Sequence, residues 1–381
     1  MSLLNNQVRG TSRSAAHLKT LSRERVVVAM SGGVDSSVAA ALLVERGYEV
    51  IGVMMHLWAE EGLSDDGVES ANRCCSPEAV EDARRVCQIL GIPFYLINVQ
   101  EAFRKHVVDY FIAEYERGRT PNPCLVCNRY IKFDLLLRRA MALDARYLAT
   151  GHYARIDRAD GFYRLLRGVD RFRDQSYLLY MLTQAQLRHI LFPLGEHTKE
   201  QVRALARKKD LPVADKDESR EICFVLDNDY RRFLQTHAPQ TIRPGPILNT
   251  TGQMIGQHKG LPFYTIGQRH GLGIPFSEPL YVLEIDADRN ALIVGPAGEL
   301  GRRELVARQV NFISGQVPAE PMAVTAKIRY QHLEAEATIT TLESEPEAVR
   351  VSFAAPQRDI TPGQGVVFYR GEEVIGGGII A

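Results

Sequence analysis

Apolar runs and helix-like patterns alternate through the first 150 residues. Val26 to Ala29 is a four-residue apolar run, short enough for a strand that is buried on both faces. Similar runs occupy Glu49 to Met55, Pro93 to Val99 and Tyr147 to Thr150. Apolar residues at helical spacing between and after the runs predict four helices, at Ser36 to Gly47, Ser76 to Gly91, Ala102 to Tyr115 and Tyr130 to Leu143. This alternation predicts an α/β domain whose parallel sheet is covered by helices on both faces.

A glycine turn, Ser31-Gly32-Gly33, follows the first strand, and Ser36 or Ser37 can cap the helix after it. The first amides of that helix, the nearby hydroxyls and a glycine backbone that a phosphate can approach closely together predict an anion site. A bare glycine turn of this kind also occurs in α/β proteins that bind nothing there. The segment lacks both the lysine of a Walker A loop and the G-x-G-x-x-G dinucleotide fingerprint.

The turns at Ser31, Met55 and Gly151 all follow parallel strands. Parallel sheets bind ligands beyond the carboxyl ends of their strands, so we expect these turns to converge on one nucleotide.

The second half of the chain changes character. Helical patterns cover Thr183 to Ile190 and Lys199 to Lys209, and the basic residues of the latter read most simply as a solvated helix face. Proline and glycine over Ala238 to Pro246 mark a linker. Short β-rich segments beyond Glu278 predict a small antiparallel barrel or sandwich. We therefore expect a disordered basic tail over residues 1–24, an α/β domain over 25–225, a central domain over 226–278 and a β-barrel over 279–381.

Composition narrows the class of protein. The chain has 381 residues and a formal net charge of +0, which argues against binding nucleic acid by electrostatics alone. It has no apolar run of the length that spans a membrane, so no membrane partner is expected. The basic start lacks the apolar core of a secretory signal. We expect a cytoplasmic protein, with a transit peptide to the mitochondrial matrix as the alternative.

Six cysteines are too few for a disulfide framework in a chain of this length. Cys87 shares an apolar helix face and is expected in the core. Cys124 and Cys127 lie on a proline-stiffened loop entering the Tyr130 helix, where a helix N-terminus favours the thiolate. With Cys223 they admit several interpretations: a zinc site completed by Cys74 or Cys75, a redox dithiol, a three-cysteine [4Fe-4S] cluster, or a persulfide pair.

Several segments together resemble a known family. SGGVDSS at Ser31 to Ser37 resembles the loop of the PP-loop ATP pyrophosphatases, which split ATP into AMP and pyrophosphate while adenylating a substrate. The chain as a whole is similar to the tRNA-specific 2-thiouridylases from about Val26 onward. That similarity rests on the loop and, in the same order as in the family, on GRTPNPCLVCN (118–128), ATGHYAR (149–155), DQSYLLYML (174–182), EICF (221–224), TIGQRHGLG (265–273) and the terminal GGGII.

The resemblance implies a fold and an activity. The fold is a PP-loop domain (HUP-like, adenine nucleotide α-hydrolase-like), a small central domain and a C-terminal antiparallel β-barrel. The activity is ATP-dependent replacement of the C2 oxygen of the wobble uridine by sulfur, through an adenylated uridine. The implied cofactors are ATP and Mg²⁺. The implied partners are the anticodon stem-loop of tRNA and a sulfur donor such as a cysteine desulfurase or a relay protein.

The resemblance also assigns residues. Cys127 matches the nucleophile and Cys223 the persulfide carrier, with a disulfide between them after sulfur transfer. ATP-binding positions match Ala29, Met30, Ser31, Gly32, Gly33, Val34, Asp35, Ser36, Met55 and Gly151. tRNA-binding positions match Asn122, Pro123, Cys124, His152, Arg173, Asp174, Gln175, Arg329, Tyr330 and Gln364.

Two positions depart from the family pattern. Cys124 stands where many members have Asp, so Cys124, Cys127 and Cys223 also resemble variants proposed to hold a [4Fe-4S] cluster, a route in which no disulfide forms. Arg173 stands where Lys is usual, which keeps the charge but changes the donor geometry. Two rival functions remain: a PP-loop ligase or amide synthetase that needs neither RNA nor thiols, and a nucleotide-regulated RNA-binding protein without turnover.

Overall fold

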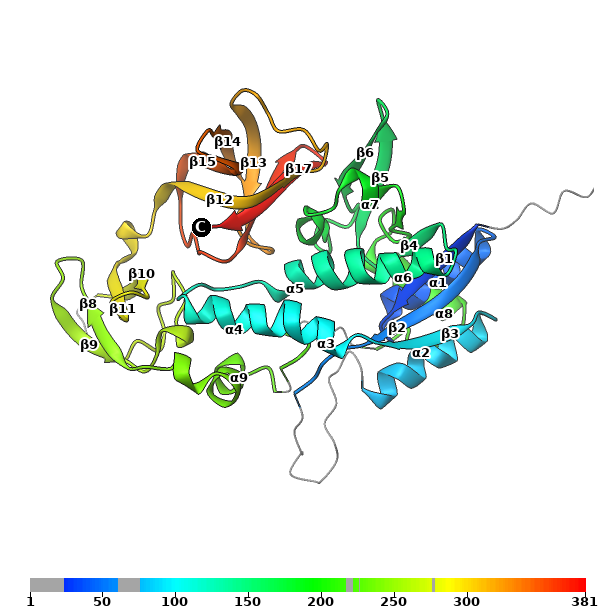
Figure 1. Cartoon of the computed structure of the whole chain (residues 1–381), viewed down its shortest axis with the longest axis horizontal. Helices are drawn as coiled ribbons and strands as arrows, with labels where there is room; N and C mark the ends of the chain where they lie inside the picture. Colours follow the sequence, from blue (N-terminus) through cyan, green and yellow to red (C-terminus); the bar gives the residue numbers. More distant parts are fainter. Residues whose placement is uncertain (1–23, 61–75, 217–221, 226, 276–277) are drawn as a thin grey trace, which may run out of the picture.

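The computed structural model describes residues 24–60, 76–216, 222–225, 227–275 and 278–381. The expected basic tail, apart from Glu24, lies outside the described residues, as do Cys74, Cys75 and the residues just before Ile222. Figure 1 shows an α/β domain joined by long helices to a small β domain and to a C-terminal barrel. No helix in the described ranges has both the length and the apolar character needed to cross a membrane.

The first domain is built on a five-stranded parallel sheet in the order β3-β2-β1-β4-β7. Its strands are β1 (Arg25–Met30), β2 (Glu49–His56), β3 (Phe94–Asn98), β4 (Tyr147–Ala149) and β7 (Ile190–Leu191). Alternate residues of β1 serve two cores. Val26 and Val28 pack on one face with α1 (Val34–Glu45), α2 (Pro77–Ile89) and α8 (Lys199–Lys208). Val27 packs on the other face with the long helices described next. The prediction of a parallel sheet covered on both faces is confirmed.

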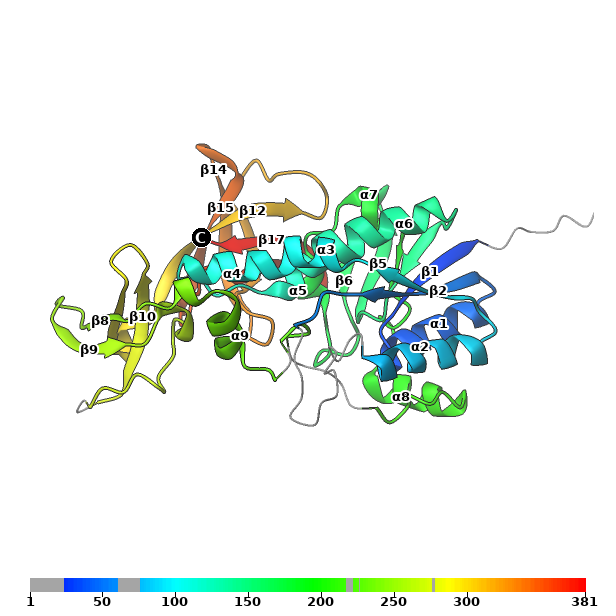
Figure 2. The same cartoon turned by 60° about the horizontal axis from the view of Figure 1, so that its bottom comes forward.

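Two long helices cross the molecule side by side in both views (Figures 1 and 2). The first comprises α3 (Gln100–Phe103), a π-helical segment (Arg104–Val108) and α4 (Asp109–Glu116). The second comprises α5 (Pro123–Val126), a π-helical segment (Cys127–Leu136) and α6 (Leu137–Ala142). The second helix was expected to begin at Tyr130. It begins at Pro123 because the Asn122 side chain caps it and proline suits the first helical position, so Cys124 and Cys127 lie within the helix.

The segment between β4 and β7 contains a hairpin that the apolar pattern did not predict. Its strands, β5 (Ala154–Ala159) and β6 (Phe162–Arg167), pair with each other, and β6 pairs with the last strand of the barrel. The helix expected over Thr183 to Ile190 is only α7 (Gln184–Leu187), because Ile190 enters β7. The hairpin therefore joins the α/β domain to the barrel through backbone hydrogen bonds.

The central domain contains α9 (Tyr230–His237) and a four-stranded sheet in the order β10-β11-β8-β9. The strands are β8 (Gly245–Leu248), β9 (Met254–His258), β10 (Leu280–Asp286) and β11 (Ala291–Pro296). The sequence analysis assigned β10 and β11 to the barrel. They belong here instead, because β11 pairs with β8 and because Val282, Leu292 and Val294 pack on Ile247 in a separate apolar core. The end of this domain thus lies near Pro296.

The C-terminal sheet closes on itself, which makes it a barrel rather than a sandwich. Its order is β12-β15-β14-β13-β16-β17-β6-β5, and β12 also pairs with β17. The strands are β12 (Arg302–Phe312), β13 (Met322–Lys327), β14 (Ala335–Leu342), β15 (Glu345–Gln357), β16 (Gly365–Arg370) and β17 (Glu373–Ile380).

The glycines near the C-terminus have a packing role. A Cβ atom at Gly376 would lie 2.3 Å from the carbonyl oxygen of Asn311, and one at Gly377 would lie 2.7 Å from the Tyr180 ring. At the other end of this contact, a Cβ atom at Gly365 would lie 2.9 Å from a methyl of Leu125. The barrel therefore docks closely on the helix that carries Cys124 and Cys127.

Candidate active site

The turn between β1 and α1 is narrow and internally bonded. Gly32 has φ of +68°, and a Cβ atom there would lie 2.3 Å from the Ala79 carbonyl oxygen, so only glycine fits. The Ser36 hydroxyl accepts from the Ser31 amide at 3.1 Å and donates to the Gly33 carbonyl at 3.1 Å. The helix begins at Val34, with Gly33 rather than a serine as its N-cap. The serines fix the turn, which leaves the first amides of α1 to bind an anion.

The end of β4 meets this turn, as its place in the sheet predicts. A Cβ atom at Gly151 would lie 2.9 Å from the Ser36 amide nitrogen, so glycine permits the contact. Met55 is buried near the end of β2, the strand beside β1. The end of β4 therefore meets the first turn of α1, and the end of β2 lies beside the end of β1 in the sheet.

Asp35, in that first turn, is held by two residues that sequence reasoning did not single out. The Lys199 ammonium donates to its two carboxylate oxygens at 2.8 and 2.9 Å, and the Tyr153 hydroxyl donates to Oδ1 at 2.7 Å. Lys199 is buried and stands at the first position of α8, where the helix dipole disfavours a cation. A lysine directly after the N-cap Thr198 was the available signal. The pair neutralises an acid that would otherwise repel a bound phosphate.

His152 follows Gly151 and is buried. Its Nδ1 lies 2.7 Å from the Thr150 hydroxyl, and its ring packs against Phe133 and Phe192. Burial, together with the nearby Lys132 ammonium, holds the pKa of His152 well below its usual value. The ring is therefore neutral at pH 7, and in this conformation it supports the end of β4.

Cys124 and Cys127 lie one turn apart at the start of the second long helix. Cys124 is exposed, and its backbone amide donates to the Asn122 side chain at 3.1 Å. Cys127 is buried at the first position of the π-helical segment, and the next residue, Asn128, is held by a hydrogen bond of 2.8 Å to the Leu178 carbonyl. The segment DQSYLLYML thus fixes the cysteine-bearing helix from one side.

Cys223 reaches the same region through its neighbour. Phe224 is fully buried, with its ring 5.9 Å from that of Phe103 and 5.3 Å from that of Phe111. Cys223 is half-buried and packs against the apolar core that also contains Cys127. The fold therefore brings two cysteines that are distant in sequence to one apolar core.

The described residues do not fit a metal centre. They include Cys124, Cys127 and Cys223, yet no group of three or more His, Cys, Asp or Glu side chains among them is arranged to hold a metal ion. The expected [4Fe-4S] ligand set is therefore not assembled in this conformation. Asp35, the acid at the turn between β1 and α1 (the phosphate turn), is bonded to Lys199 and Tyr153.

Cys87 is a core residue as expected, and burial raises its pKa to about 11.

Residues expected to contact tRNA fall into two groups. Asp174 is buried and accepts from the Gly168 and Ser176 amides, while Gln175 exchanges hydrogen bonds with the Tyr153 backbone. In this conformation the Asp174 carboxylate accepts its hydrogen bonds from within the protein. Gln175 therefore positions Tyr153.

The second group joins the domains. Gln364 donates to the Thr120 carbonyl at 2.8 Å, just before Asn122 and Pro123. Arg329 donates to the Ile266 carbonyl at 3.3 Å, across the interface between barrel and central domain. The Tyr330 ring lies 5.9 Å from that of Tyr177. Gln364 thus holds the barrel beside the start of the cysteine-bearing helix, and Arg329 holds it against the central domain.

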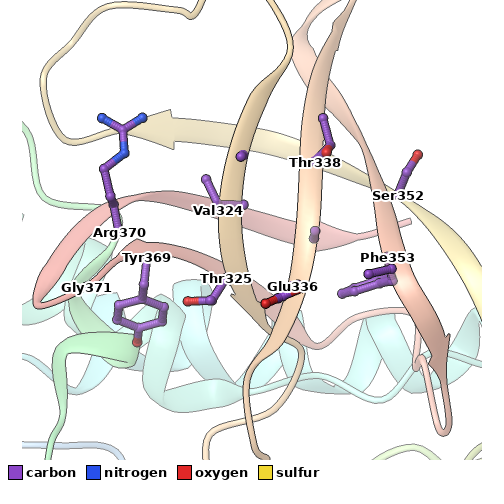
Figure 3. Close-up of a pocket in the computed structure, with 12 residues that line it drawn as sticks. Val324, Thr325, Glu336, Thr338, Ser352, Phe353, Tyr369, Arg370 and Gly371 are labelled. Atoms are coloured by element: carbon purple, nitrogen blue, oxygen red, sulfur yellow. The ribbon is translucent and has the colours of Figure 1, made fainter.

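A pocket of about 650 Å³ lies on the barrel (Figure 3). Tyr369, Thr325, Glu336 and Phe353 form a row across four neighbouring strands, and none of the predicted site residues lines it. The pocket is therefore separate from the phosphate turn and from the cysteines.

Comparison with known proteins covers almost the whole chain. Family models match three consecutive regions: a tRNA methyl transferase HUP domain at residues 24–227, a tRNA methyl transferase PRC-barrel domain at 231–296 and an aminomethyltransferase beta-barrel domain at 302–380. The chain is 52% identical over 365 residues to the tRNA-specific 2-thiouridylase MnmA of Carboxydothermus hydrogenoformans, covering 95% of this chain and 99% of that protein.

Two further relatives carry the same name. The protein from Symbiobacterium thermophilum is 54% identical over 360 residues, covering 94% of this chain and 92% of the relative. The protein from Moorella thermoacetica is 54% identical over 357 residues, covering 93% and 98%. The similarity thus spans all three domains.

Proposed function

The chain belongs to the MnmA family of tRNA-specific 2-thiouridylases, which are tRNA sulfurtransferases, and we propose a division of labour between its two halves. The turn at Ser31 to Ser36 activates ATP, and the cysteines deliver sulfur to C2 of the wobble uridine. The observation that carries the proposal is that Cys223 packs on the same apolar core as Cys127, in a domain where a glycine turn leads from β1 into the N-terminus of α1.

The ATP step makes a poor leaving group into a good one. The C2 carbonyl of uridine is amide-like, and sulfur does not displace its oxygen unaided. That oxygen attacks the α-phosphorus of ATP, the bond to the β-phosphate oxygen breaks, and pyrophosphate leaves. The α1 amides stabilise the charge on the departing pyrophosphate, while Lys199 keeps Asp35 from opposing it.

Sulfur transfer then uses two cysteines. The terminal sulfur of a Cys223 persulfide attacks C2 and AMP departs, leaving a disulfide between that sulfur and Cys223 Sγ. The Cys127 thiolate attacks Cys223 Sγ, which releases 2-thiouridine and leaves a Cys127–Cys223 disulfide. A thiol reductant must reopen this disulfide before the next cycle. The uridine must leave its stack to reach the site.

Mg²⁺, the sulfur donor and the location complete the proposal. Mg²⁺ enters on the phosphate oxygens of ATP as part of the substrate. A cysteine desulfurase or a relay protein supplies the persulfide sulfur to Cys223, and the anticodon stem-loop presents the uridine. The named relatives are bacterial, so we place the reaction in the cytoplasm.

Incubation with ATP and unmodified tRNA tests the activity. We expect AMP release that depends on tRNA, and 2-thiouridine when persulfide is supplied. AMP release without tRNA would indicate a ligase, and tRNA binding without AMP release would indicate a binding protein.

Cysteine variants test the sulfur route. Cys127→Ser and Cys223→Ser should each abolish 2-thiouridine, whereas Cys87→Ala, which removes a thiol from the core, should retain it. Anaerobically purified protein should be colourless and free of iron. Brown, iron-bearing protein that loses both iron and activity on Cys124→Ala would replace the persulfide route with the cluster route.

A further inference from the structure

Two apolar side chains stand out on the surface. Phe172 is 99% exposed and Leu333 is 87% exposed, the two highest values among the large apolar side chains of the described ranges. Phe172 lies between β6 and the short helix at Ser176–Leu179, and Leu333 lies between β13 and β14 of the barrel. A single exposed apolar residue needs no explanation, but these two lie on segments that are anchored together.

Leu333 is held through the residue that follows it. Glu334 forms an ion pair with Arg167, the last residue of β6, with a distance of 2.6 Å from Nη1 to Oε1. Arg167 is buried and also donates from Nε to the Gly371 carbonyl at 3.1 Å. The barrel turn that carries Leu333 is therefore anchored to the hairpin of the α/β domain.

Phe172 is also held at this junction, which is the contact between the β5–β6 hairpin and the barrel. Arg171, which precedes it, pairs with Glu372, the residue after Gly371. The backbone amide of Phe172 donates to Asp170 at 3.2 Å, and the second oxygen of Asp170 accepts from the Lys199 amide at 2.9 Å. The loop thus presents a fully exposed ring. Through Asp170 the same loop contacts Lys199, whose side chain holds Asp35.

The barrel pocket adjoins this junction. The Arg167 guanidinium lies 3.6 Å from the centre of the Tyr369 ring, and Thr325 donates to Glu334 at 2.7 Å. Tyr369, Thr325 and Gly371 all line the pocket in Figure 3. The two apolar tips therefore stand beside a hollow in the barrel surface.

We propose that Phe172 and Leu333 contact unpaired nucleobases of the tRNA, a role that rests on the proposed function. A fully exposed aromatic ring suits a nucleobase, because aromatic rings stack on the faces of unpaired bases. A stable protein partner would need a continuous surface of roughly 1,000 Å². Here the residue next to each exposed side chain forms an ion pair, Glu334 with Arg167 and Arg171 with Glu372.

Binding of unmodified tRNA to variants tests this proposal. Phe172→Ala should weaken the affinity roughly 10-fold, since stacking on one base has about that value, and Phe172→Trp should retain it. Leu333→Ala should weaken the affinity less, and the double variant more than either. The slope of affinity against salt concentration should not change, because no cation is removed.

The control is Tyr95→Ala, which removes a 53% exposed ring from β3, outside this junction, and should leave tRNA affinity unchanged. Melting temperatures and the KM for ATP should match wild type in the Phe172 and Leu333 variants, because both side chains are almost fully exposed. Unchanged tRNA affinity in the double variant would overturn the proposal. A different result would contradict the proposed function. In that case wild-type protein would release no AMP in response to tRNA, whether or not Phe172 and Leu333 contact the tRNA.

Discussion

The phosphate turn and the cysteine region lie in one domain but are built differently. At the turn, Gly32 admits no other residue, and Lys199 and Tyr153 both hold Asp35. In the cysteine region, Cys124 is exposed, Cys127 is buried and Cys223 is half-buried against the same core as Cys127. The turn proposed to bind ATP is thus fixed by its own contacts, whereas the described cysteines share at most an apolar core and are not arranged as a ligand set.

This contrast fits the chemistry proposed for each region. Stabilising the charge on a leaving pyrophosphate requires fixed dipoles, because dipoles that must reorient do not lower the barrier. Sulfur transfer requires a cysteine that first takes up a persulfide sulfur and then brings it to the base. A rigid arrangement of all three thiols would obstruct that movement. The contrast predicts that a small substitution within the turn lowers activity more than an equally small substitution elsewhere in the chain.

The largest effect is expected from Gly32→Ala. A Cβ atom there would lie 2.3 Å from the Ala79 carbonyl oxygen, and the residue has positive φ. Displacing the turn should lower kcat/KM for ATP roughly 100-fold and stability by about 1–3 kcal/mol. Steady-state AMP release and chemical denaturation measure the two quantities.

Gly47→Ala is the matched control, since Gly47 also has positive φ but a Cβ atom there would meet nothing within 4 Å. It should lower stability without changing the KM for ATP. Equal kinetic losses in the two variants would erase the distinction between a fitted turn and an ordinary strained glycine.

Lys199→Met should have the next largest effect. It leaves Asp35 charged beside the phosphate site, so the KM for ATP should rise roughly 10- to 100-fold, the value of a charge-assisted contact. Lys199→Arg should restore part of the loss, because it restores the charge. If Lys199→Met lowered stability alone and left the KM for ATP unchanged, Lys199 would be a packing residue rather than part of the ATP site.

A pH effect is expected at His152. Its pKa is depressed in the folded protein, so below pH 6.5 the unfolded chain takes up a proton that the folded chain does not. The contribution of His152 to the free energy of unfolding is therefore complete above pH 6.5. It falls below pH 6.5 by at most about 1.4 kcal/mol per pH unit. The difference in unfolding free energy between wild type and His152→Gln, measured from pH 7 to 5, should narrow as the pH falls. A constant difference would contradict a buried neutral ring.

The smallest effect is expected at the domain junction, from Gln364→Ala. The variant loses the neutral hydrogen bonds from the Gln364 side chain to the Thr120 and Pro121 carbonyls, which should raise the KM for tRNA about fivefold because the barrel docks more loosely beside the Asn122 cap. The KM for ATP should stay at its wild-type value. If the KM for ATP changed instead, the barrel contact at Gln364 and the phosphate turn would be coupled more tightly than their contacts indicate.

Local patterns predicted most of the first domain. A short apolar run followed by two glycines specifies a strand, a tight turn and a helix, and the strand order places Gly151 at the same edge. The start of the second long helix was predicted too late, because proline before Cys124 was interpreted as a loop rather than as the first helical residue. The hairpin after β4 was missed, since its strands lack an uninterrupted apolar run and β6 pairs with a strand more than 200 residues away.

The parts of the site that escaped prediction are long-range contacts. Lys199 and Asp35 are separated by 164 positions, and nothing near either residue specifies the other. Asp174 was expected to face tRNA from its motif, yet its carboxylate is used by local amides. Sequence motifs thus indicate which residues matter, whereas the partners of each residue follow only from the fold.

One measurement tests the sulfur route most directly. Protein carrying a persulfide on Cys223 is mixed with ATP and unmodified tRNA for a single turnover without reductant, and its cysteines are then mapped by mass spectrometry. We predict one AMP, one 2-thiouridine and one Cys127–Cys223 disulfide per active site. Formation of 2-thiouridine with both cysteines still reduced would contradict the account.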